Sequence, residues 1–247
     1  MNSPLVTYTK ISPNRSYPRK MAIDRITVHC TVGQMSVETL GAVFARPQRQ
    51  ASSNYGIGPD GRIGLYVDEG DRSWCSSSAE NDNRAVTIEV ASDAKHPYAV
   101  TDEALAATIA LCEDICRRNG KKKLLWFGDK NKTLAYKPAA DEMVMTVHRW
   151  FANKVCPGDY LYSKHGYIAQ EVTRRLQEDD EVITDRKLKN KDTGEIVTVK
   201  GILKNGQNYI RLADLGDMQV LDVSYDAVNN LAEVGRKRCC LLDPVTH

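Results

Sequence analysis

The sequence has little excess charge, no long apolar run and no regular spacing of cysteines, and each absence narrows what the protein can be. Its 34 basic and 32 acidic residues leave a net charge of +2 over 247 residues. Electrostatics therefore give no reason to expect nucleic acid or a membrane as the main partner. No apolar stretch approaches the roughly 20 residues that a membrane-spanning helix needs.

The N-terminal residues also lack the pattern of a secretory signal. Residues 1–7 contain no charged segment that leads into an apolar one. We therefore expect no signal peptide, and a protein that stays in the cytoplasm of the producing cell until something else releases it.

Seven cysteines form an odd-numbered set without the spacing of a disulfide framework. Cys112 and Cys116 fall four residues apart on a predicted helix, which is typical of core packing. We therefore expect the cysteines to be reduced thiols.

Predicted strands alternate with predicted helices over residues 1–178, which indicates an α/β domain. The expected strands are residues 25–30, a hairpin within 54–67, 85–90, 124–127 and 143–148. Ser36 and Thr101 are predicted N-caps of helices, a further helix is expected over 163–176, and the polar residues 76–83 are expected to be a loop. The acidic stretch over residues 177–181 indicates a linker, placed at 179–183, and residues 184–247 are expected to be a small β-rich domain.

The period-two alternation of two of these strands places polar residues on one face. In residues 25–30, Ile26 and Val28 lie on one face and His29 on the other. In residues 85–90, Glu89 is likewise opposite the apolar residues. His29 and Glu89 therefore belong to the same type of polar strand face.

Two histidines and one cysteine form a candidate metal-ligand set. His148 and Cys156 are separated by seven residues, with Lys154 between them, and His29 lies in the strand expected over residues 25–30. Two imidazoles and one thiolate suit Zn²⁺ and leave a fourth tetrahedral position open, as catalytic zinc sites do. Taken singly, each would more often be a packing residue, so the prediction requires the fold to bring all three together.

Several segments resemble the zinc-dependent N-acetylmuramoyl-L-alanine amidases, a family that includes phage lysins and peptidoglycan recognition proteins. In chain order they are Ile26-Thr27-Val28-His29-Cys30-Thr31, Ser52-Ser53-Asn54-Tyr55-Gly56-Ile57 with the Pro59-Asp60-Gly61 turn, Trp74 with Asn83, Thr87-Ile88-Glu89, and residues 148–158. The resemblance implies a mixed central β-sheet flanked by helices, with zinc held by His29, His148 and Cys156 in a groove.

The resemblance also implies roles for four other residues. Glu89 is the expected general base, and Lys154 the group that stabilises the oxyanion. Tyr55 and Trp74 are expected to line the groove and contact substrate, although either could belong to the core. The chain departs from the family pattern at Cys75, where many members have histidine after the tryptophan.

The C-terminal segment weakly resembles the small module at the N-terminus of copper amine oxidases. The likeness rests on Asn208-Tyr209-Ile210-Arg211-Leu212 and Val223-Ser224-Tyr225-Asp226. No copper site is implied, because the only histidine in this segment is the terminal His247. Cell-wall binding and formation of homo-oligomers are both open as roles of residues 184–247.

Together these patterns predict a phage-type endolysin that hydrolyses peptidoglycan between the lactyl group of N-acetylmuramic acid and L-alanine. A cellular autolysin would have the same features. One alternative is a non-catalytic peptidoglycan-binding protein of the same fold. Another is a cysteine peptidase with Cys156 as nucleophile and His148 as base.

Overall fold

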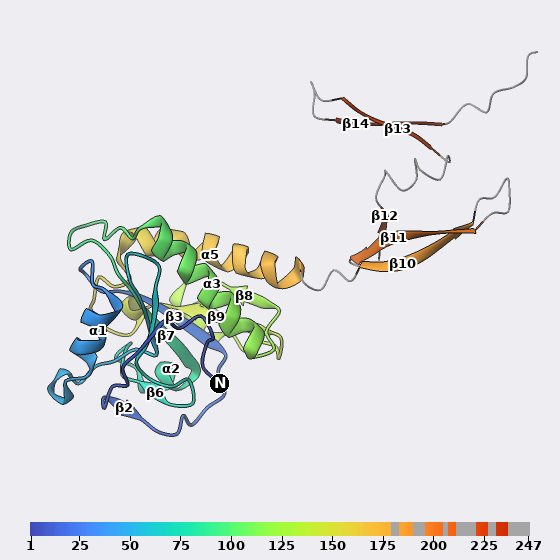
Figure 1. The fold of residues 1–247 in the computed structure, drawn as a ribbon. Helices are drawn as coiled ribbons and strands as arrows, with labels where there is room; N and C mark the ends of the chain where they lie inside the picture. The colour runs from blue at the N-terminus through green and yellow to red at the C-terminus, as the bar shows by residue number, and fades with distance from the viewer. Residues whose placement is uncertain (179–182, 190–195, 205–206, 211–220, 227–230, 237–247) are drawn as a thin grey trace, which may run out of the picture. The chain divides into compact units, whose positions relative to one another are not determined.

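The computed structural model describes residues 1–178, 183–189, 196–204, 207–210, 221–226 and 231–236 (Figure 1). It divides into two compact units, Met1–Gln177 and Glu178–His247. The predicted linker lies almost wholly outside the described residues. Among the residues that are described, no helix has both the length and the apolar character needed to cross a membrane.

The first unit is built on a seven-stranded sheet in the order β1-β5-β4-β7-β3-β9-β8. The strands are β1 (Tyr8–Thr9), β5 (Ile63–Leu65), β4 (Tyr55–Ile57), β7 (Ala85–Val90), β3 (Arg25–Cys30), β9 (Glu142–Thr146) and β8 (Lys123–Leu125). Only the β4–β5 hairpin is antiparallel, and the other neighbouring strands pair in parallel. The predicted mixed sheet is therefore confirmed.

Helices flank this sheet, as predicted. They are α1 (Val37–Phe44), α2 (Ala79–Arg84), α3 (Asp102–Arg118), α4 (Lys130–Ala135) and α5 (Gly158–Glu178). The long helices α3 and α5 lie together over one face (Figure 1). The core contains Val28 and Ile88 from the sheet, Ile109 and Ile115 from α3, and Leu161 and Ile168 from α5.

Capping fixes where two of the helices begin. The Ser36 side chain accepts a hydrogen bond from the backbone N–H of Thr39, and the Thr101 side chain accepts one from that of Ala104. Each bond satisfies one of the amide groups that lack a partner in the first turn. Both predicted N-caps are therefore confirmed.

The two central strands have one apolar face and one polar face. Ile26, Val28 and Ile88 are buried in the core beneath α3 and α5. On the other face, β3 pairs with β7 so that His29 lies directly opposite Glu89. In parallel strands, residues paired in this way point to the same side. The polar face predicted from alternation therefore brings a candidate ligand and a candidate base together.

The structure differs from the prediction at residues 79–84, which form helix α2 and not part of a loop. Ser78 caps this helix by accepting from the N–H of Asn81. The buried carboxylate of Asp82 accepts hydrogen bonds from the N–H groups of Cys75 and Ser76. These tertiary contacts, and not an apolar periodicity, stabilise the short polar helix.

A second difference concerns His148. The sequence predicts a strand that ends on this residue, but β9 ends at Thr146 and His148 begins a 3₁₀ turn, His148–Trp150. Short pairings were also not predicted, among them β2 (Arg15–Ser16) with β6 (Arg72–Ser73). His148 therefore follows the carboxyl end of β9, and its ring lies 5.1 Å from that of His29 between centroids.

The second unit is β-rich in its described parts. Strands β10 (Ile183–Lys189), β11 (Ile196–Lys204) and β12 (Gln207–Ile210) form an antiparallel sheet. Strands β13 (Leu221–Asp226) and β14 (Leu231–Arg236) form a separate antiparallel pair. The segment that resembles the copper amine oxidase module includes residues 211 and 212, which lie outside the described residues.

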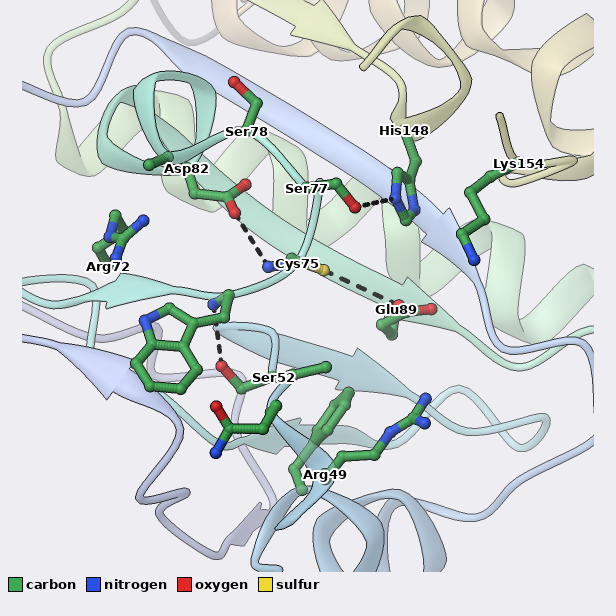
Figure 2. A pocket seen from close by; sticks show the side chains of 15 residues that line it. Arg49, Ser52, Arg72, Cys75, Ser77, Ser78, Asp82, Glu89, His148 and Lys154 are labelled. Atoms are coloured by element: carbon green, nitrogen blue, oxygen red, sulfur yellow. Dashed lines mark hydrogen bonds between the residues drawn. The ribbon is translucent and has the colours of Figure 1, made fainter. Parts of the chain in front are cut away.

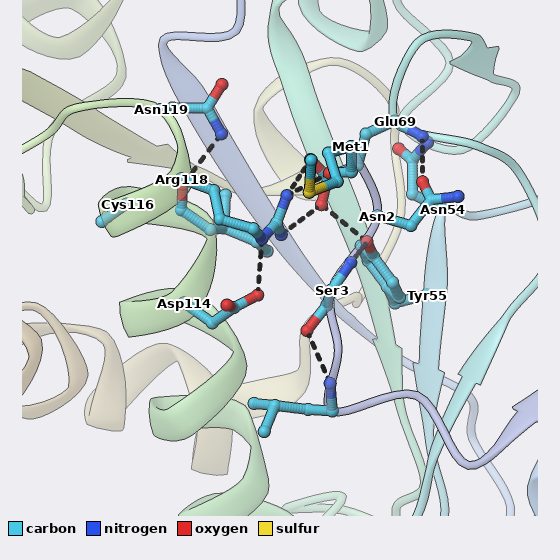
Figure 3. A network of polar contacts seen from close by, with 12 residues as sticks. Met1, Asn2, Ser3, Asn54, Tyr55, Glu69, Asp114, Cys116, Arg118 and Asn119 are labelled. Carbon is cyan, nitrogen blue, oxygen red and sulfur yellow. Dashed lines mark hydrogen bonds and ion pairs between the residues drawn. The ribbon is translucent and has the colours of Figure 1, made fainter.

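A buried ion pair connects α3 to the sheet and to the N-terminal residues (Figure 3). The Arg118 guanidinium donates to both carboxylate oxygens of Glu69, at 2.7 and 2.8 Å. The same carboxylate accepts from the Tyr55 hydroxyl at 2.6 Å, and that hydroxyl accepts from the N–H of Ser3. The Glu69 side chain is only 3% exposed, so these contacts offset the free-energy cost of burying its negative charge.

We expect Arg118→Met to lower the free energy of unfolding by about 3–5 kcal/mol, because it leaves the Glu69 charge buried without its cation. Urea denaturation measures this. The control is Arg117→Met, whose partner Glu113 lies nearer the surface, and a loss of about 1 kcal/mol or less is expected there. Equal losses in the two variants would contradict the prediction.

Candidate metal centre and substrate groove

The fold brings the three predicted ligands together. His29 comes from the end of β3, His148 from the 3₁₀ turn after β9, and Cys156 from the loop before α5. One donor atom from each lies within 4.8 Å of the others. The Cys156 Sγ atom is 3.3 Å from the His29 Nδ1 atom, and the two imidazole centroids are 5.1 Å apart. A single cation can therefore contact all three residues.

The electrostatics of this cluster suit a metal ion. Burial, followed by the neighbouring His148 and His165, holds the pKa of His29 well below its usual value. Burial and the ammonium of Lys154 lower the pKa of His148. Both rings are thus neutral at physiological pH, which is the form that binds metal. Because the donors are soft, converge and are largely buried, the residues fit Zn²⁺.

Glu89 lies beside this cluster on the neighbouring strand. Its Oε1 atom is 3.9 Å from the Nδ1 atom of His29. Burial, with a smaller effect of Cys30, raises the pKa of Glu89 to about 8. The Oε2 atom has no hydrogen-bond partner among the described residues. Glu89 is therefore a carboxylate that can take up and give back a proton near neutral pH.

Two adjoining cavities open onto the cluster. The larger, about 460 Å³, is shown in Figure 2, and the smaller is about 270 Å³. Both are lined by Phe44, Arg49, Glu89, His148 and Lys154. Cys156 lines only the smaller cavity, and Trp74 and Cys75 only the larger one. His148, one of the three candidate ligands, therefore lies in the wall shared by the two cavities, and Cys156 lies in the wall of the smaller one.

Lys154 lies on the loop between His148 and Cys156, and its predicted role stays a prediction. Its side chain is exposed, and it lines both cavities next to His148 (Figure 2). The ammonium group is thus at the shared wall of the two hollows, where it can reach a group held at the metal position.

Tyr55 is not where the sequence interpretation placed it, and the expectation that it lines the groove has to be corrected. It pairs in register with Ile88, so it points to the apolar side of the sheet, and it is completely buried. Its hydroxyl binds Glu69. Trp74, in contrast, is half-buried and lines the larger cavity, with its indole N–H donating to Ser16. Contact between Trp74 and substrate stays a prediction.

Sequence interpretation missed two residues that touch the candidate site. The Ser77 hydroxyl is 3.0 Å from the Nε2 atom of His148, and the Cys75 Sγ atom is 3.8 Å from the Oε1 atom of Glu89. The departure from the family pattern at Cys75 was a usable signal. The sequence held no comparable signal for Ser77. The position of its side chain depends on a left-handed backbone conformation, φ 61°, in the loop whose backbone N–H groups bind Asp82.

The fold thus brings together a possible metal-ligand set, a neighbouring carboxylate and two cavities. The candidate ligands lie at and beyond the carboxyl ends of β3 and β9, with the half-buried carboxylate of Glu89 beside them. A family model described as N-acetylmuramoyl-L-alanine amidase matches residues 19–159, which is more than half of the chain. The chain belongs to this family.

Several solved structures are similar to this chain. The endolysin N-acetylmuramoyl-L-alanine amidase LysCS from Clostridium intestinale is 19% identical, with 62% of this chain and 84% of that chain covered and a TM-score of 0.43. The Ph2119 endolysin from a Thermus scotoductus bacteriophage is 14% identical, with coverages of 64% and 89% and a TM-score of 0.43. The Drosophila peptidoglycan recognition protein SA is 17% identical, with coverages of 61% and 79% and a TM-score of 0.44. Comparison with curated protein sequences found no significant match.

Proposed function

We propose that the protein is a peptidoglycan amidase of the phage endolysin type. It hydrolyses the amide bond between the lactyl group of N-acetylmuramic acid and L-alanine of the stem peptide. Membership of the amidase family supports the substrate class. The observation that carries the proposal is the convergence of His29, His148 and Cys156 beside Glu89 in an open groove.

In this proposal His29, His148 and Cys156 would hold Zn²⁺. When bound, the ion would supply Lewis acidity toward the amide carbonyl and the attacking water. The protein residues position it: the Ser77 hydroxyl contacts the Nε2 atom of His148 and orients its ring, and strand pairing fixes His29 opposite Glu89.

Glu89 acts as the general base and then as the general acid. Its carboxylate accepts the proton of the attacking water, and it later returns the proton to the departing amine of L-alanine. A pKa raised by burial suits both steps, because the carboxyl group can hold the proton between them. The unpaired Oε2 atom leaves a lone pair available for this transfer.

Lys154 stabilises the negative charge that develops on the carbonyl oxygen. We expect Lys154→Met to lower kcat by about 10²–10³-fold with a smaller change in KM, because the interaction forms mainly in the transition state. Steady-state turbidity assays on purified walls measure both constants. The matched control is Lys132→Met on α4, which lines neither cavity. A change only in KM would indicate that Lys154 binds the ground state instead.

Removal of the metal is expected to stop the reaction. Treatment with a chelator should lower activity roughly 100-fold or more, and stoichiometric Zn²⁺ should restore it, because the protein residues alone do not polarise the amide. Metal content before and after treatment is read by atomic emission. Full activity in metal-free protein would reject the mechanism.

The decisive experiment is digestion of Gram-positive peptidoglycan followed by mass spectrometry of the products. The proposal expects stem peptides with free L-alanine N-termini and glycan strands that keep the lactyl group. Binding of zinc and wall without any cleavage would favour the non-catalytic alternative. Cleavage at a peptide–peptide bond would reject the assigned bond.

The thiol peptidase alternative has less support. Its base would be His148, but the Nε2 atom of that ring contacts the Ser77 hydroxyl, and the imidazole atom 3.3 Å from the Cys156 Sγ atom is the Nδ1 atom of His29.

For the second unit, wall binding and oligomer formation both stay predictions, as does accumulation in the cytoplasm before release.

A further inference from the structure

A second set of metal donors overlaps the first. His29, Cys75 and Glu89 each offer one donor atom, and these atoms also lie within 4.8 Å of one another. The Cys75 Sγ atom is 3.8 Å from the Oε1 atom of Glu89, which is itself 3.9 Å from the Nδ1 atom of His29. The two sets share His29 and differ in their other two members.

The position of the Cys75 sulfur is fixed by the backbone around it. The N–H groups of Cys75 and Ser76 both donate to the buried carboxylate of Asp82, at 3.0 and 3.1 Å. This anchor holds the segment after β6 against α2. The thiol therefore lies at the wall of the larger cavity and faces Glu89 (Figure 2).

The chemistry of this second set suits zinc. Imidazole, thiolate and carboxylate are all common zinc ligands. A thiolate and a carboxylate together neutralise the charge of a divalent cation, whereas His29, His148 and Cys156 supply one negative charge. In a buried site the neutral combination has the lower desolvation cost. The Oε2 atom of Glu89, which has no partner among the described residues, is free to take part.

We propose that His29, Cys75 and Glu89 form a second zinc position, in which the protein holds the metal without hydrolytic activity. The Nδ1 atom of His29 has one lone pair, so the two sets cannot both be complete at once. A metal ion in the second position occupies Glu89, which then cannot act as a base. This consequence for activity rests on the proposed function, but the binding of metal does not.

The test is a cobalt(II) titration of metal-free Cys156→Ser, which lacks the thiolate of the first set. We expect one Co²⁺ per chain, with a thiolate-to-cobalt charge-transfer band supplied by Cys75. The band should disappear in Cys75→Ser/Cys156→Ser. It should remain in the matched controls Cys30→Ser/Cys156→Ser and Cys112→Ser/Cys156→Ser, which remove thiols outside the second set.

A band that is absent from Cys156→Ser, or that survives removal of Cys75, would overturn the proposal. Should Cys156→Ser fail to fold, His148→Ala breaks the first set and keeps every thiol. In that variant zinc should protect Cys75 from alkylation by iodoacetamide, read by peptide mass spectrometry, and an absence of protection would also overturn it. None of these measurements uses peptidoglycan, so wall cleavage by the wild type is judged separately.

Discussion

Cys156→Ser is expected to reduce wall hydrolysis by about 10³-fold or more, because the variant loses one of the three ligands that would hold the catalytic ion. Serine is a poor zinc ligand, and the donor set would keep only the two imidazoles of His29 and His148. Any metal that the variant retains should bind in the set formed by His29, Cys75 and Glu89, where it does not support hydrolysis. The measurement is release of L-alanine N-termini from purified walls at matched protein concentration.

The matched control for this substitution is Cys112→Ser, a buried thiol on α3 that lies in the core away from both cavities. It tests whether loss of any buried thiol inactivates the protein through instability. Activity of Cys156→Ser within tenfold of the wild type would contradict the assignment of Cys156 as a ligand. Equal losses in both variants would point to stability instead.

Glu89→Gln is expected to lower kcat by about 10²–10⁴-fold while zinc bound per chain stays unchanged. Glutamine has nearly the same shape and can keep the contact with Cys75, but it cannot accept a proton. Because Glu89 is not in the ligand set used for hydrolysis, metal content separates a lost base from a lost ligand. Steady-state kinetics and atomic emission on the same preparation give both values.

The control for the base is Glu80→Gln, on the exposed side of α2 and outside both cavities. It changes the net charge by the same amount, and its activity should match the wild type. If Glu89→Gln kept most of its activity, the base would have to be another group, and the raised pKa of Glu89 would reflect burial alone.

The positions of His29 and Glu89 could be predicted because they depend on local periodicity. Alternation fixes which side of its own strand each residue occupies. The structure adds the register of β3 with β7, which places the two residues directly opposite each other. The starts of α1 and α3 were predictable for a similar reason, since a capping hydroxyl acts within three residues.

Tyr55 and Ser77 could not be placed from the sequence because their positions depend on distant partners. The side of the sheet that Tyr55 faces follows from its pairing with Ile88, 33 positions further along the chain. Ser77 reaches His148 only because Asp82 holds the preceding backbone. A tyrosine within a hairpin is equally compatible with groove and core, and only the tertiary register decides.

The two cavities that share His148 and Lys154 in their walls affect how a polymeric substrate can enter the site. A site at the closed end of a pocket accepts only chain ends, whereas one midway along a groove accepts a strand laid across it. The bond assigned here joins a long glycan to a peptide that is often cross-linked to its neighbours. Two cavities that share His148 and Lys154 in their walls would leave room for such a junction to enter from the side. Under the proposed function, cleavage is therefore expected within an intact sacculus and does not require a free end.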